Sequence, residues 1–103
     1  MEDRVIDAKC KRIVELNSRS RQLLKVSEEC SELSRAVSRY VYDDTAIDNL
    51  VEEYVDVLIV CRELEHLIIN DIGIEPFCDL MEKWETKKIA NLDNVIEDLE
   101  NLQ

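Results

Sequence analysis

Two short clusters of acidic side chains are the residues of this sequence best suited to chemistry. They occupy residues 28–32 and residues 52–56. Carboxylates one helical turn apart repel each other by about a few tenths of a kcal/mol unless a cation compensates them. Oxygen ligands without histidine or cysteine are those that Mg2+ and Mn2+ prefer over zinc. The clusters therefore indicate a divalent-metal site, with a solvated acidic surface ridge as the plainer alternative.

The composition predicts the kind of fold that must position these acids. The chain has 103 residues, 46% of them hydrophobic, with a single glycine and a single proline. So few turn-forming residues predict long helices and few connections. We therefore expect one all-α domain over residues 1–103, an antiparallel bundle of four to five helices completed by oligomerisation. The expected helices cover residues 3–16, about 20–41, about 46–69, about 76–90 and about 92–102.

Apolar residues repeat every three to four positions along the second and third expected helices, as in the seam of a helix bundle. The connection at residues 42–45 is short, so these two helices should be antiparallel neighbours. The predicted seam residues are Leu23, Val26, Cys30, Leu33, Val37 and Tyr40 on one helix, and Leu50, Tyr54, Val57, Cys61, Leu64 and Ile68 on the other.

Four acids lie on the flanks of these seams. At about 100° per residue, Glu29 and Glu32 lie roughly 70° and 130° from the centre of their seam. Glu53 and Asp56 lie roughly 80° and 140° from theirs, rotated in the same sense. In an antiparallel pair, flanks of the same sense meet along one edge, so we expect these four carboxylates to gather there. Glu28 points nearly opposite its seam.

The net charge restricts the binding partners expected for this protein, and the cysteines indicate its redox compartment. A net charge of −11 repels nucleic acid polymers and anionic membranes, so neither is expected as a partner. It also repels a free triphosphate, so a nucleotide substrate needs multivalent cations between itself and the protein. The four cysteines form no CxxC motif or zinc ladder, and we interpret them as buried, small apolar residues of a reduced, cytoplasmic protein.

The two acidic clusters together resemble the EExxE…ExxD signature of the MazG-like, all-α nucleoside triphosphate pyrophosphohydrolase superfamily. Glu28, Glu29 and Glu32 match the first half, and Glu53 and Asp56 match the second. The resemblance covers residues 19–70 well and the following helix loosely. The paired motif at this separation, in a helical chain of this size, is fairly specific.

The resemblance implies hydrolysis of a (deoxy)nucleoside triphosphate between its α and β phosphates, giving the monophosphate and pyrophosphate for nucleotide-pool house-cleaning. It implies that Glu29, Glu32, Glu53 and Asp56 bind Mg2+, with Mn2+ as a substitute. Glu28 would share in metal binding or water activation, so Glu28 and Glu29 are the catalytic candidates. The family's dimers and tetramers imply a homodimer or homotetramer here.

Residues on two of the expected helices are predicted to contact the substrate. Lys25 and Gln22 share the flank of the first cluster, so Lys25 is expected at phosphate and Gln22 at the base or sugar. Family members often carry basic residues on the last helix, which makes Lys83 and Lys87 phosphate-binding candidates, although surface lysines are equally common near a helix end.

Two other hypotheses compete with the enzyme. The chain is alternatively a non-catalytic helical interaction module that uses its acidic ridge against a basic partner. Glu63-x-x-His66 resembles half of a di-iron carboxylate site. Only one such element exists and both residues lie away from the apolar seam, so we expect His66 at the surface.

Overall fold

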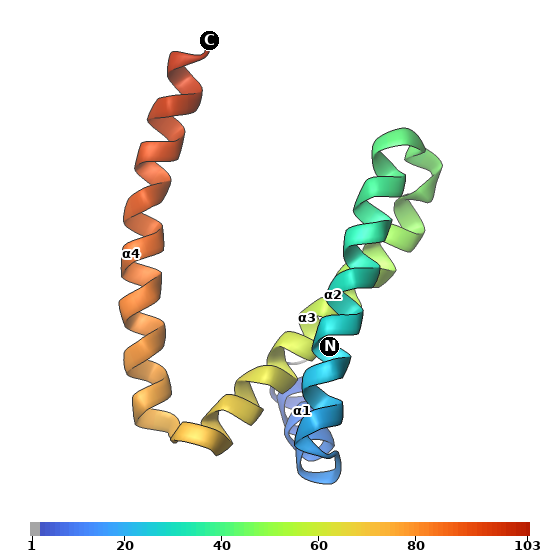
Figure 1. Cartoon of the computed structure of the whole chain (residues 1–103), viewed down its shortest axis with the longest axis vertical. Coiled ribbons are helices and arrows are strands. Elements are labelled where there is room, and N and C mark those ends of the chain that lie inside the picture. The colour runs from blue at the N-terminus through green and yellow to red at the C-terminus, as the bar shows by residue number, and fades with distance from the viewer. Residues whose placement is uncertain (1–2) are drawn as a thin grey trace. The chain divides into compact units, whose positions relative to one another are not determined.

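The computed structural model describes residues 3–103, and every regular element in that range is helical (Figure 1). The all-α prediction is therefore confirmed. The first three helices begin and end within three residues of their predicted bounds. The elements are α1 (Asp3–Leu16), α2 (Arg19–Tyr42), the 3-10 turn η1 (Asp44–Ala46), α3 (Ile47–Ile72) and α4 (Ile74–Asn101).

The prediction of a separate short helix at residues 92–102 is wrong. These residues continue α4 without a break to Asn101. The physical reason is that nothing between Ala90 and Leu92 interrupts a helix, since Asn91 costs only a fraction of a kcal/mol there. Gly73 does mark a boundary, because its φ of +93° suits glycine and separates α3 from α4.

The chain consists of two compact units. One unit ends at Ile68 and contains α1, α2 and most of α3, whereas the other comprises Ile69–Gln103 and is dominated by α4. The prediction of one domain over the whole chain stays a prediction. None of the residues in α4 is buried. No helix within residues 3–103 is both long and apolar enough to cross a membrane.

Helices α2 and α3 lie side by side and antiparallel in the first unit (Figure 1). Gln22 near the start of α2 contacts Glu63 late in α3, whereas Glu29 further along α2 meets Glu53 early in α3. The helices are joined through Asp43, whose carboxylate accepts a hydrogen bond of 3.1 Å from the Thr45 backbone N–H. This tight connection fixes which turns of the two helices face each other.

The line of contact between α2 and α3 differs from the predicted seam. Gln22 and Ala36 are the buried residues of α2, one position before the predicted Leu23 and Val37. The contact line is therefore shifted from the predicted seam toward the acidic flank. The small side chain of Ala36 lets α2 and α3 approach closely along this line. The apolar surface of each helix is wider than the area that one neighbouring helix covers. The predicted seam residues left exposed are Leu23, Cys30, Val37, Tyr40, Tyr54 and Cys61.

Helix α1 covers part of α3. Cys10 is 2% exposed, and its Sγ lies 3.8 Å from the carbonyl oxygen of Ile59. Asp3 and Asp7 pair with Arg62 and His66 at 3.0 and 2.8 Å. His66 therefore lies partly exposed at the edge of the contact between α1 and α3, where it is hydrogen-bonded to Asp7.

Only one of the four cysteines has the predicted buried environment. Cys10 is buried, but Cys30, Cys61 and Cys78 are exposed and all four are free thiols. The prediction is wrong for these three because Cys30 and Cys61 belong to the apolar rows that the rotated contact leaves outside. Cys78 lies on α4, which buries no residue within its own unit.

Candidate functional site

Three of the four predicted acids meet between α2 and α3. One carboxylate oxygen from each of Glu29, Glu53 and Asp56 lies within 4.8 Å of the other two. All three side chains are half-buried. Because the antiparallel pairing brings the middle of α2 against the first turns of α3, ligands distant in sequence converge. We refer to Glu29, Glu53 and Asp56 as the carboxylate cluster.

Glu32, the fourth predicted acid, adjoins the carboxylate cluster. It is half-buried, and its nearby carboxylate contributes to raising the pKa of both Glu29 and Glu53. It lies one turn beyond Glu29 on α2, where it faces the same neighbours on α3. This position places its carboxylate where it can bind the same cation as the cluster.

Burial and like charge act together on this cluster. Loss of water contact raises the pKa of Glu29 above its ordinary value of 4.5, and the charges of Glu32 and Asp56 raise it further, while Lys25 lowers it. Burial followed by the charges of Glu32 and Asp56 likewise raises the pKa of Glu53. These carboxylates therefore hold protons more readily than free glutamate, unless a cation replaces the proton.

Two oxygens of the cluster have unsatisfied hydrogen-bonding capacity. Oε2 of Glu29 and Oε2 of Glu53 are buried and have no hydrogen-bond partner among the described residues. A buried, unpartnered carboxylate oxygen is costly, so such atoms usually accept a hydrogen bond or bind a metal. The donor set is oxygen only, and it comes from two rigid helices. These residues fit a hard divalent cation such as Mg2+ or Mn2+.

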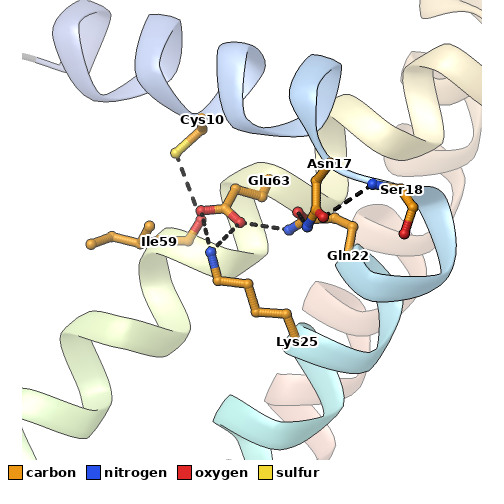
Figure 2. Close-up of polar contacts among 7 residues, drawn as sticks. All are labelled: Cys10, Asn17, Ser18, Gln22, Lys25, Ile59 and Glu63. Atoms are coloured by element: carbon orange, nitrogen blue, oxygen red, sulfur yellow. Dashed lines mark hydrogen bonds and ion pairs between the residues drawn. The ribbon is translucent and has the colours of Figure 1, made fainter.

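A second polar group lies further toward the end of α3 (Figure 2). Glu63 is completely buried, and its Oε1 accepts hydrogen bonds from Gln22 Nε2 at 2.5 Å and from Lys25 Nζ at 3.0 Å. Asn17 Nδ2 donates to Gln22 Oε1 at 3.0 Å, so both ends of the Gln22 amide are engaged. Ser18, the N-cap of α2, follows directly and donates its backbone N–H to Asn17 Oδ1.

Sequence reasoning placed Glu63 away from the core, and this was wrong. Its signal was available, because Glu63 follows Asp56 by seven residues and therefore shares its helix face to within about 20°. Gln22 was predicted to contact the base or sugar of a substrate. The structure places it in the core at 1% exposure, and its substrate role stays a prediction.

The remaining predicted site residues lie outside the carboxylate cluster. Glu28 is exposed on α2. Lys83 and Lys87 belong to the unit Ile69–Gln103, where their ammonium groups lie 5.1 and 5.4 Å from the centre of the Trp84 ring. Such distances are typical of cation–π contacts. Their predicted roles in catalysis and phosphate binding stay predictions.

A comparison of the chain with protein-family models, with curated proteins and with solved structures finds no match. Two groups of side chains are therefore the features that point to a function. They are a carboxylate cluster with buried, unpartnered oxygens and, one helical turn away on α2, a lysine held by a buried glutamate.

Proposed function

We propose that the protein is a Mg2+-dependent nucleoside triphosphate pyrophosphohydrolase of the MazG-like type. It converts a (deoxy)nucleoside triphosphate into the monophosphate and pyrophosphate, and so removes unwanted nucleotides from the pool. The observation that carries the proposal is the meeting of Glu29, Glu53 and Asp56 from two helices, with buried oxygens that have no partner. An acidic ridge on the surface would instead leave its carboxylates solvated.

In this proposal the carboxylate cluster and Glu32 hold the metal, Mg2+ or in its place Mn2+. When bound, such a cation neutralises charge on phosphate oxygens and lowers the pKa of a coordinated water. A carboxylate that is not fully engaged by the metal would accept the proton of that water, and Glu29 is the first candidate. Glu28 is the second candidate for this step.

The net charge of the chain supports a metal-bridged substrate. At −11, the protein repels a triphosphate at long range unless cations intervene. Lys25 is the positive side chain next to the carboxylate cluster, and 38% of its side chain is exposed. It is therefore accessible to a phosphate group. Lys83 and Lys87 are further phosphate-binding candidates in this proposal.

A homo-oligomer, either a dimer or a tetramer, completes the proposal. Both units expose large apolar side chains, including Leu58 at 50% and Trp84 at 46%. A groove of about 760 Å³ between α1 and α3 is lined by apolar residues such as Ile6, Ile13 and Leu58. Association with further copies of the chain would cover these surfaces.

The decisive experiment is pyrophosphate release from a panel of canonical and modified nucleoside triphosphates, with Mg2+ and with EDTA. Glu53→Gln should lower kcat/KM at least about a hundredfold, because it removes a metal ligand and its charge. Glu52→Gln is the matched control, since it removes the same charge from the adjacent, exposed position and should retain activity. If no nucleotide is hydrolysed and Mg2+ does not raise the melting temperature, the interaction-module hypothesis replaces the enzyme.

A further inference from the structure

Lys25 and Glu29 have a spacing at which they would ordinarily pair. They lie four residues apart on α2, and lysine and glutamate at this separation attract each other on a helix. In the structure Lys25 Nζ instead lies 3.0 Å from Oε1 and 3.5 Å from Oε2 of Glu63, on the neighbouring helix. Oε2 of Glu29 meanwhile has no hydrogen-bond partner.

Glu63 outcompetes Glu29 for the lysine because it is more deeply buried. Its side chain is 0% exposed, whereas Glu29 is half-buried. A carboxylate removed from water needs a cation or several hydrogen bonds to remain ionised, and breaking such a pair is costly. Gln22 donates a second hydrogen bond to Glu63, and Asn17 holds Gln22 in place (Figure 2). The acceptor for Lys25 is therefore fixed before any ligand arrives.

We propose that Glu63 is a positioning residue that holds Lys25 away from Glu29 and thereby keeps the Glu29 carboxylate free for a divalent cation. This inference rests on the proposed function, because the cation is the one assigned to the carboxylate cluster. Without Glu63, the Lys25 side chain turns toward Glu29, four residues further along α2, and forms an ion pair with its carboxylate. The lysine then competes with the metal for the same oxygens.

The test is Mg2+ binding, measured by calorimetry on the full chain without nucleotide. Glu63→Gln should weaken the Mg2+ affinity about fivefold, because the released Lys25 pairs with Glu29. Adding Lys25→Met to that variant should restore the affinity to within about twofold of the wild type. Lys25→Met should gain far less affinity when Glu63 is intact, because the lysine is already held away.

The non-additivity separates positioning from simple charge effects. If Glu63 acted only through its distant negative charge, Lys25→Met would change the affinity by the same factor in both backgrounds, and that result would overturn the inference. Glu65→Gln is the matched control, because it removes one charge from an exposed position of α3 and leaves the Lys25–Glu63 pair intact. It should bind Mg2+ within about twofold of the wild type.

Two further results make the outcomes distinguishable. If the wild type binds Mg2+ and releases pyrophosphate while Glu63→Gln binds Mg2+ normally, the inference falls and the proposed function stands. If the wild type binds no Mg2+, the proposed function falls and this inference with it. Should Glu63→Gln fail to fold, Glu63→Asp serves instead. Its shorter side chain withdraws from Lys25, so it should show the same loss and the same rescue by Lys25→Met.

Discussion

At the scale of single residues, the chemistry of this protein depends on where α2 and α3 place carboxylates that lack compensating groups. Burial and neighbouring charge favour the protonated forms of Glu29 and Glu53. A metal would favour the ionised forms. Protons and Mg2+ should therefore compete for the same oxygens, and this competition is measurable without any knowledge of the substrate.

The metal-free protein should lose stability as the pH rises above 4.5 and through the raised pKa values of Glu29 and Glu53. The pKa values of Glu29 and Glu53 are raised in the folded state, so the folded protein binds protons more tightly than the unfolded chain. This contribution is fully present below the ordinary value of 4.5 and disappears as the pH passes the raised values. Melting temperatures measured in EDTA across this range provide the test.

The same titration has internal controls. Saturating Mg2+ should remove most of the decline, because the cation takes the place of the protons, and Glu53→Gln should reduce it in EDTA. Asp43 does not interfere, since hydrogen bonds from Thr45 lower its pKa below 3.8 and its effect has the opposite sign at more acid pH. A melting temperature that rises with pH in EDTA would contradict this account of the carboxylate cluster.

At the scale of elements, short connections determine which residues meet. Helix α2 begins at Arg19 behind the N-cap Ser18, whose side chain accepts a hydrogen bond of 3.2 Å from the Arg21 N–H. The same junction carries Asn17, which holds Gln22 and through it Glu63. The residues at the start of α2 thus cap the helix and also hold the buried polar side chains beside the carboxylate cluster in place.

Ser18→Ala should lower the free energy of unfolding by about 1 kcal/mol, because it removes the side-chain acceptor at the start of α2. Ser38→Ala is the matched control, since Ser38 is exposed within the same helix and alanine favours helix. Chemical denaturation of the two variants and the wild type measures the difference. Equal stability of Ser18→Ala and Ser38→Ala would show that this cap contributes nothing.

The elements were largely predictable from the sequence, and the contact line between them was not. Periodicity and the single glycine correctly located α1, α2 and α3, and the flank argument correctly grouped Glu29 with Glu53 and Asp56. The predicted seam failed because periodicity shows which positions are apolar, not which of several apolar rows faces which neighbour. The apolar surface of each helix is wider than one neighbouring helix can cover. Close packing at small residues such as Ala36 therefore decides which apolar row is in contact.

Glu63 illustrates the same limit for a functional residue. A charged residue is almost never fully buried unless it is paired, so its type argued for the surface. Its pairing with Lys25 and Gln22 arises from long-range packing of α2 on α3. The sequence places Glu63 on the helix face of Asp56, but its partners depend on the register of the two helices, which follows from the length of the connection and from the contact line.

At the scale of the whole molecule, the surface combines high negative charge with much exposed apolar area. Val51, Val55 and Leu58 form an outward row on α3, each at least 45% exposed. On α4, apolar side chains from Leu80 to Leu99 remain exposed along the helix. Isolated chains with this much apolar surface tend to associate, and symmetric association of identical chains is the commonest outcome.

We therefore expect a mass in solution that is two or four times 12.1 kDa, measured by light scattering during size-exclusion chromatography. Leu58→Asp should reduce this mass, because it places a charge in the apolar row of α3. It should not unfold the chain, since Leu58 is already 50% exposed. Ser27→Asp adds the same charge at an exposed polar position of α2 and should leave the mass unchanged. A wild-type mass of 12.1 kDa at every concentration would refute the oligomer, and the apolar row of α3 would then need a different partner.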